Sequence, residues 1–332
     1  MDRRLMMNKP SVSIIIPHYN IPDLLMRCLK SIPVSEDIQV IVVDDNSPNA
    51  DTYLERYPEL SRPYLEFIRT TKGGGAGYAR NVGLEHAKGK WLLFADADDF
   101  YVDNMDKLIH QYIDSKADLV YFMARSVFSD NINQPSGRYT YNDLYELYWE
   151  SHDEKRVRYN HWVPWAKMVK RELVEKYKLL FDEVQYANDV YFSVRIGFYA
   201  QQIDIANQIL YVVTTRPDSL VSSFCKKPNE LSIRADVHFR VHKFLSDNHI
   251  VLEDMPFEWI SIKMLENNKK LFNYYFKRRI EELYPSKWHY VKTVTKNYST
   301  KFRIKFYLYL FLIMCCPFRI IESQPTNNYL HE

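Results

Sequence analysis

The short apolar segment 91–94, which ends in a cluster of carboxylates, constrains this chain most. Its four residues have the bulk of a buried strand, and Asp96, Asp98 and Asp99 follow directly. Carboxylates this close repel one another, and a Mg²⁺ or Mn²⁺ ion, which prefers hard oxygen ligands, offsets that repulsion. Ligands of open α/β sheets lie beyond the carboxyl ends of the strands, so we expect a metal-bound phosphate here. A solvated acidic turn is the alternative that this cluster alone leaves open.

Composition excludes several classes of protein. The 332 residues are enough for one large or two ordinary domains, and 46% hydrophobic residues permit a sizeable core. A net charge of +2 gives no case for binding nucleic acid. The four cysteines, at positions 28, 225, 315 and 316, lack metal-ligand spacing, so the pattern supports neither a zinc site nor a disulfide framework and fits a reducing compartment. The apolar run 12–16 is too short for a signal peptide.

Strand and helix patterns alternate along the N-terminal third. We expect strands at 12–16, 39–43, 65–68 and 91–94 and helices at 22–31 and 78–87. This order is typical of a parallel sheet with crossover helices. The glycine-rich run 73–77 lacks the Gly-Lys-Ser/Thr of a phosphate-binding loop, so we interpret it as a flexible loop. Beside Arg80, its bare N–H groups would help to grip a diphosphate. Gly89 is expected to end the second helix.

Four motifs in a fixed order carry a family resemblance. They are SIIIPHYN at 13–20, VVDDNS at 42–47, GYARNVGL at 77–84 and FADADD at 94–99. In this order they resemble the family 2 glycosyltransferases with the GT-A fold, closely over residues 11–105 and more loosely to about residue 220. The resemblance implies an α/β fold with a mixed, mainly parallel sheet flanked by helices.

The resemblance also implies a domain organisation. Residues 1–225 would form the catalytic domain, with a nucleotide-sugar-binding half at 11–105 and an acceptor-side half at 106–225. The resemblance does not extend to residues 226–332, where aromatic and apolar positions at helical spacing predict a helical region.

By resemblance, one group of residues holds a UDP-sugar donor. The residues that would border the nucleobase, the ribose, the sugar and the diphosphate are Pro17, Tyr19, Asn20, Asp44, Asp45, Arg80, Asp96 and Arg216. Among them, Asp44 would contact the uracil or ribose and Arg80 would face the diphosphate. Asp98 would ligate Mn²⁺ or Mg²⁺, which stabilises the negative charge of the departing nucleoside diphosphate as a Lewis acid. Ordinary turn chemistry is the alternative for Pro17, Tyr19 and Asn20.

The middle third carries the residues expected on the acceptor side. Trp162 and Trp165 are candidates for stacking on a sugar ring, and core packing is the alternative for both. In the family, a Glu-Asp pair opens a helix and its Asp is the general base; here the pair reads Asn188-Asp189. The resemblance therefore implies Asp189 as the base of an inverting transfer, without the neighbouring charge that would raise its pKa. The alternative is that Asp189 only caps the helix that follows.

The C-terminal third contains a basic segment at 287–321 with an apolar run at 306–318. The apolar run is shorter than the roughly 20 residues that span a bilayer, and its basic flank fits a helix lying in a membrane surface. A helix packed on the catalytic domain or at a homodimer contact is the alternative. Peripheral attachment to the cytoplasmic face of the membrane would suit a lipid-linked glycan acceptor.

Together these features predict an inverting glycosyltransferase that moves a hexose or N-acetylhexosamine from a UDP-sugar to a saccharide or lipid-linked glycan, in polysaccharide or lipopolysaccharide assembly. One alternative is a nucleotidyltransferase on a related scaffold, although that class generally carries a glycine-rich basic loop where residues 17–20 stand here. A non-catalytic nucleotide-sugar-binding partner subunit is the other, because Asn188 departs from the family pattern.

Overall fold

The computed structural model describes residues 9–216, 229–250, 260, 263–264 and 267–283. The chain divides into two compact units, residues 1–275 and 276–332, and the features below lie in the first. The predicted membrane-surface segment 287–321 lies outside the described residues. Within the described ranges, no helix combines the length and apolar character needed to cross a membrane.

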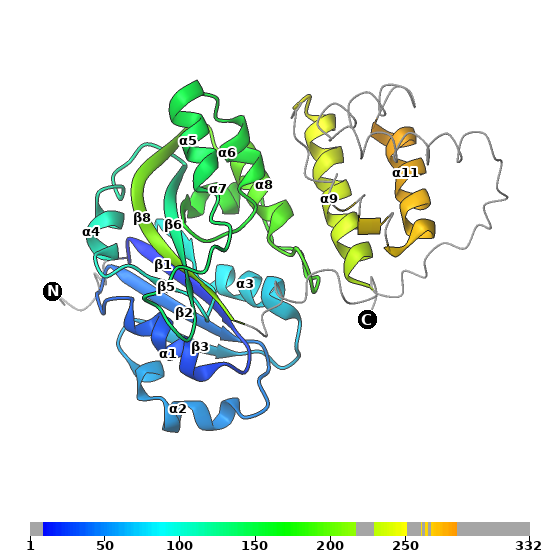
Figure 1. The fold of residues 1–332 in the computed structure, drawn as a ribbon. Coiled ribbons are helices and arrows are strands. Elements are labelled where there is room, and N and C mark those ends of the chain that lie inside the picture. The colour runs from blue at the N-terminus through cyan, green and yellow to red at the C-terminus, as the bar shows by residue number, and fades with distance from the viewer. Residues whose placement is uncertain (1–8, 217–228, 251–259, 261–262, 265–266, 284–332) are drawn as a thin grey trace. The chain divides into compact units, whose positions relative to one another are not determined.

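One eight-stranded sheet organises the first unit, in the order β3-β2-β1-β4-β7-β6-β8-β5 (Figure 1). Its strands are β1 (Val12–His18), β2 (Ile38–Asp44), β3 (Leu65–Arg69), β4 (Trp91–Phe94), β5 (Phe100–Tyr101), β6 (Leu119–Phe128), β7 (Lys167–Lys170) and β8 (Ile203–Thr215). Strands β1 to β4 run parallel, β7 is antiparallel to both β4 and β6, and β5 is antiparallel to β8. The sheet is therefore mixed but mainly parallel, as predicted.

Strand register brings the motif residues to the carboxyl ends of neighbouring parallel strands. Ile15 pairs with Ile41 of β2 and with Phe94 of β4, and His18 pairs with Asp44. The first strand thus continues through His18, beyond the end predicted at residue 16, because its register with β2 extends that far. The last long strand of the sheet, β8, is continuous from Ile203 to Thr215.

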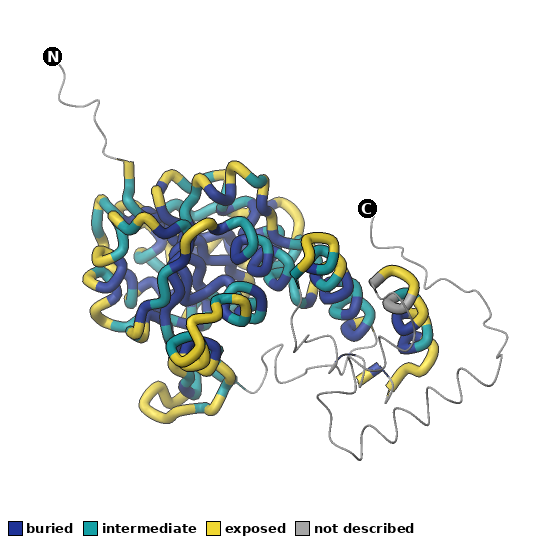
Figure 2. Tube along the Cα trace, turned by 90° about the horizontal axis from the view of Figure 1, so that it is seen from above, coloured by how far each residue is buried: buried dark blue, intermediate teal, exposed yellow. Residues whose placement is uncertain are grey.

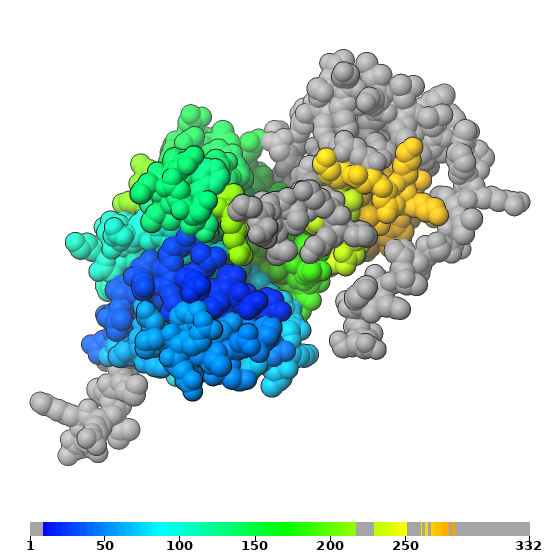
Figure 3. Space-filling model, turned by 60° about the horizontal axis from the view of Figure 1, so that its bottom comes forward, coloured from blue at the N-terminus to red at the C-terminus, as the bar shows by residue number. Residues whose placement is uncertain are grey.

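Helices cover both faces of the sheet. They are α1 (Pro22–Lys30), α2 (Tyr53–Arg56), α3 (Gly75–His86), α4 (Met105–His110), α5 (Asn142–Ser151), α6 (Lys155–Asn160), α7 (Arg171–Lys176) and α8 (Val190–Tyr199). Helix α9 (Glu230–Asp247) packs against α8, and α11 (Lys269–Leu283) spans the boundary between the two units. Alternate residues of β1 enter different cores: Val12, Ile14 and Ile16 pack with α1 and α4, whereas Ile15 packs with α3 and α8. Figure 2 shows the strands as the buried centre of this unit, and Figure 3 shows the surface formed by the blue N-terminal strand–helix units.

Two glycines allow the close approaches that position the site. Helix α3 begins at Gly75, so part of the predicted flexible loop is its first turn. A Cβ on Gly77 would lie 2.0 Å from the carbonyl oxygen of Asp182, so only glycine lets α3 approach the segment before α8. Gly89 does not end the helix, which stops at His86. A Cβ on Gly89 would lie 2.4 Å from the backbone nitrogen of Ser13, so this glycine serves packing against β1.

Candidate active site

A cavity of about 780 Å³, called here the front cavity, lies at the carboxyl ends of the parallel strands. The predicted site residues that line it are Pro17, Tyr19, Arg80, Asp96, Asp98, Trp162, Trp165, Asp189 and Arg216. The structure therefore brings the residues predicted for the donor, the metal, the base and the acceptor around one space. Asn20, Asp44 and Asp45 do not line it.

Asp44 lies beneath the cavity wall, fully buried. Its carboxylate accepts hydrogen bonds from His18 Nδ1 at 2.7 Å and from the backbone nitrogen and hydroxyl of Ser47 at 2.8 and 2.7 Å. Because His18 Nε2 accepts the N–H of Ile21, the proton of His18 lies on Nδ1. Burial opposes ionisation of Asp44, but the hydrogen bonds from His18 and Ser47 outweigh it and lower its pKa.

The same network fixes the loop that follows β1. The hydroxyl of Ser47 also accepts the backbone N–H of Asn20 at 2.8 Å, and Asn20 adopts a left-handed φ of 53°. Asp44 in this structure thus holds two loops together and does not reach the front cavity.

Asp45 caps helix α3 from a distance. Its two carboxylate oxygens accept the backbone N–H groups of Gly74 and Gly75 at 2.9 and 2.7 Å. A glycine at the N-cap has no side chain to do this, and a carboxylate at a helix N-terminus is also favoured by the helix dipole. The glycine-rich run is therefore used to start the helix that carries Arg80.

Arg80 links the carboxylate cluster to the segment before α8. The side chain is buried and forms an ion pair with Asp96 at 2.6 Å and a hydrogen bond to Asn188 Oδ1 at 2.8 Å. Its guanidinium lies 5.3 Å from the centre of the Phe181 ring, while its Nε has no partner among the described residues. Asn188, which replaces the acidic residue of the family pattern, thus accepts a hydrogen bond from the same arginine that neutralises Asp96.

Asp98 lies at the cavity edge, and its surroundings disfavour its charge. Burial and the neighbouring Asp96 raise its pKa, against the opposing charge of Arg216, whose Nε lies 3.1 Å from Asp98 Oδ2. Asp99 is buried beside it and accepts the backbone N–H of Thr214 at 2.6 Å. Burial, and then Asp98, raise the pKa of Asp99 well above its usual range.

Arg27 of α1, which the sequence did not single out, fixes the loop after β4. It donates to the backbone oxygens of Asp98 at 2.5 Å and Ser129 at 2.8 Å. Arg27 therefore connects the loop with the predicted metal ligand to α1 and to the residue that follows β6.

Asp189 stands at the start of α8 with its side chain facing the cavity lining. It makes no capping hydrogen bond, so capping does not explain its presence. Burial raises its pKa; Arg80 opposes this shift, Asp96 adds to it, and Lys167 opposes it. A raised pKa makes this carboxylate a stronger base than an ordinary aspartate.

The two predicted tryptophans differ in exposure. Trp165 is buried and stacks on Tyr211 with ring centres 5.4 Å apart, so core packing accounts for most of its surface. Trp162 is half-buried, donates its indole N–H to the Tyr159 carbonyl at 2.8 Å and packs edge-on against His238. Of the two, Trp162 offers more surface to the cavity.

Sequence reasoning missed other residues of the cavity wall. Arg138, Tyr139 and Tyr141 line it from the segment between β6 and α5. This segment folds back on β6, since the N–H of Ser136 donates to Ser126 and Arg138 donates to the Thr214 carbonyl. No local pattern marks these residues, because their partners lie far away in the sequence.

Residues 13–177 match the family model described as Glycosyl transferase family 2. The chain belongs to glycosyltransferase family 2. It is 25% identical over 232 residues to EpsH of Bacillus subtilis, covering 67% of this chain and 65% of that protein. It is also 27% identical over 226 residues to the EpsJ glycosyltransferase of the same organism, covering 64% of this chain and 63% of that protein. The match thus spans just under two thirds of these relatives' own lengths.

A solved structure confirms the fold class. The crystal structure of S. aureus TarS 1-349 in complex with UDP-GlcNAc superposes with a TM-score of 0.54 and 19% sequence identity. The superposition covers 86% of this chain and 76% of that one. The predicted GT-A fold is therefore confirmed.

Proposed function

We propose that this protein is an inverting, metal-dependent glycosyltransferase that moves a hexose or N-acetylhexosamine from a UDP-sugar to a saccharide or lipid-linked glycan. The observation that carries the proposal is the front cavity, in which Asp189, with its raised pKa, lies with the Asp96 and Asp98 carboxylates. The family membership supports the reaction class. The TarS complex, a fold relative, carries a UDP-sugar.

Asp189 acts as the general base in this proposal. Its carboxylate takes the proton of the acceptor hydroxyl while that oxygen attacks the anomeric carbon. The bond from the anomeric carbon to the diphosphate oxygen breaks on the opposite face, which inverts the configuration. One carboxylate is enough, because the leaving diphosphate needs charge stabilisation more than a proton.

The Asp96 and Asp98 side chains fit a divalent cation that binds together with the donor. They are 30% and 19% exposed, and both border the cavity. Within the described ranges, no group of three or more His, Cys, Asp or Glu residues could hold a metal alone. Mg²⁺ is commonly bound by one or two carboxylates plus substrate phosphates, which fits this pair. When bound, the ion would stabilise the charge of the departing diphosphate.

In addition to the metal ion, Arg216 supplies positive charge on the donor side. It pairs with Asp98 here, and we propose that it turns to the diphosphate when a cation takes over the carboxylate. We also propose that the reaction takes place at the cytoplasmic face of the membrane, in the synthesis of cell-surface polysaccharide. The basic and apolar pattern of residues 287–321 supports this location.

Transfer or hydrolysis of a panel of UDP-sugars with Mn²⁺ tests the proposal on the full chain. We expect Asp189→Asn to lower the rate by at least about 100-fold, as loss of a general base does. UDP affinity should stay within twofold, and the exposed control Asp103→Asn should match the wild type. Equal rates in the wild type and Asp189→Asn would show that Asp189 is not the general base. No turnover with retained UDP binding would favour the non-catalytic partner subunit.

A further inference from the structure

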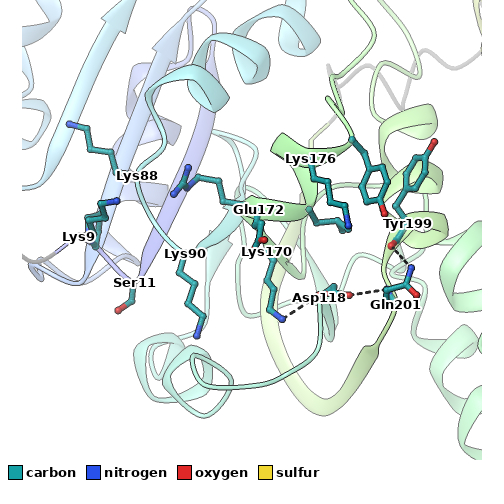
Figure 4. Close-up of a pocket in the computed structure, with 14 residues that line it drawn as sticks. Lys9, Ser11, Lys88, Lys90, Asp118, Lys170, Glu172, Lys176, Tyr199 and Gln201 are labelled. Atoms are coloured by element: carbon teal, nitrogen blue, oxygen red, sulfur yellow. Dashed lines mark hydrogen bonds and ion pairs between the residues drawn. The ribbon is translucent and has the colours of Figure 1, made fainter.

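A second cavity, of about 670 Å³, lies at the amino ends of the same strands (Figure 4). We call it the rear cavity. Its lining comes from the segment before β1, the turn before β4, and the junction of β7 with α7. The seven residues of β1, at about 3.3 Å each, separate the two cavities by roughly 20 Å. The rear cavity shares no lining residue with the front cavity.

The rear cavity concentrates positive charge. The cations that line it are Lys9, Lys88, Lys90, Lys170, Arg171 and Lys176, against the two carboxylates Asp118 and Glu172. The whole chain is almost neutral, with 44 basic and 42 acidic residues. The rear cavity is therefore a local excess of charge and does not reflect the overall composition.

Part of this charge is already compensated. Asp118 pairs with Lys170 Nζ at 3.2 Å and accepts the backbone N–H of Gln201 at 2.8 Å, as the dashed lines in Figure 4 show. Arg171 donates to the Gly89 carbonyl at 2.8 Å and forms an ion pair with Glu175. Lys90 donates to the Ile113 carbonyl at 2.7 Å and lies 3.9 Å from the Asp114 carboxylate. These groups form the wall of the cavity, and a ligand that bound them would have to break these ion pairs and hydrogen bonds.

Three lysines remain without a carboxylate. Lys9, Lys88 and Lys176 form no ion pair within the part of the chain that the structure describes, and Glu172 pairs with none of them. They come from three separate segments and are exposed around the same cavity. Figure 4 shows Lys9 and Lys88 on the β1 and β4 side of the cavity and Lys176 on the α7 side. A single surface lysine is simply solvated, but several cations around one concave space raise the local potential for an anion. Each ammonium offers three donors, which suit phosphate oxygens.

We propose that the rear cavity binds a compact anion that carries a phosphate or pyrophosphate group. The three lysines without a carboxylate partner supply the charge, and the stacked rings of Tyr177 and Tyr199, 4.0 Å apart, line the cavity on the side of Lys176. The phosphate has two sources, a free phosphate compound or the headgroup of an acidic lipid. The proposal does not depend on the proposed function, because it uses no residue of the front cavity.

The test measures pyrophosphate binding to the full chain by calorimetry, with a variant that carries Lys9→Gln, Lys88→Gln and Lys176→Gln. A matched control carries Lys30→Gln, Lys107→Gln and Lys155→Gln, which removes the same charge from exposed positions outside both cavities. We expect the rear variant to bind pyrophosphate at least tenfold more weakly than the control variant. Binding of pyrophosphate in the front cavity would be equal in both variants, so the difference isolates the rear cavity.

A second arm identifies the source of the phosphate. The same three proteins are floated with vesicles of phosphatidylglycerol and phosphatidylcholine, or of phosphatidylcholine alone. Loss of phosphatidylglycerol binding only in the rear variant would support the proposal with a lipid headgroup as ligand. A difference in pyrophosphate binding without a difference in flotation would support it with a free phosphate compound. If the rear and control variants agree in both arms, the proposal is overturned.

Discussion

Charged side chains are paired at the carboxyl end of the sheet and partly unpaired at its amino end. At the carboxyl end, Arg80 pairs with Asp96 and Arg216 pairs with Asp98, so both carboxylates of the loop after β4 that line the front cavity have a cation beside them. At the amino end, three lysines of the rear cavity have no carboxylate partner in the described part of the chain. An anion that enters the front cavity must therefore exchange partners with groups that are already paired. An anion that enters the rear cavity adds a partner and displaces none.

The largest effect should follow from removing Asp98, the proposed metal ligand of the front cavity. We expect Asp98→Ala to abolish the part of UDP binding that depends on Mn²⁺, because an oxygen ligand is lost and Arg216 loses its partner. Calorimetry with and without Mn²⁺ measures this part directly. Asp103→Ala, at an exposed position, is the control. Unchanged UDP affinity with Mn²⁺ would show that the front carboxylates are not the metal site.

A difference in stability should distinguish the paired arginine of the front cavity from the unpaired lysines of the rear cavity. Arg80→Ala leaves Asp96 without its buried partner and should lower the free energy of unfolding by roughly 3 kcal/mol. Lys88→Ala at the exposed rear should change it by no more than about 0.5 kcal/mol. Urea unfolding of both variants gives the comparison, and similar losses would mean that the two ends do not differ in charge pairing.

A smaller effect should come from the remote helix cap. Asp45→Ala removes both acceptors from the N–H groups of Gly74 and Gly75 and should cost about 1 kcal/mol of unfolding free energy. Because α3 carries Arg80, the variant should also weaken nucleotide binding in the front cavity. Asp45→Asn retains one acceptor and should recover part of the loss; an Ala variant as stable as the wild type would rule out the cap.

The smallest effect at neutral pH concerns Asp189, the proposed base. Asp189 must be deprotonated to accept a proton, and its pKa is raised by burial, so activity should fall with decreasing pH through that raised pKa. The acid limb of the rate should therefore lie above the value of about 3.9 for an ordinary aspartate. A pH–rate profile of transfer measures this limb, while UDP binding over the same range controls for the metal site. A limb at or below the ordinary value would contradict the burial of Asp189.

The sequence predicted what local patterns encode. The apolar runs identified the strands, and parallel strands place their carboxyl ends together, so the position of Asp96 and Asp98 beside Pro17 and Tyr19 followed from the pattern. It did not predict how successive carboxylates divide their roles. Asp44 and Asp45 alternate in direction at the end of β2, so one is buried with His18 and the other caps α3.

Long-range contacts explain most of what the sequence missed. Arg80 and Asn188 are 108 positions apart, and Arg27 and Ser129 are 102 apart, so no periodicity links them. Arg138 joins the cavity because its loop folds back on β6 and bonds to Thr214 of β8. Such contacts follow from tertiary packing, which spacing along the chain does not show.

The length of β1 has a consequence for how the two cavities influence each other. Roughly 20 Å is about twice the distance over which salt at 0.1 M screens exposed charges. Lysines at one extremity of the strand therefore exert little pull on a nucleotide at the other. An anion bound in the rear cavity would leave the electrostatic potential in the front cavity almost unchanged. Substitutions could therefore alter binding in either cavity independently of the other.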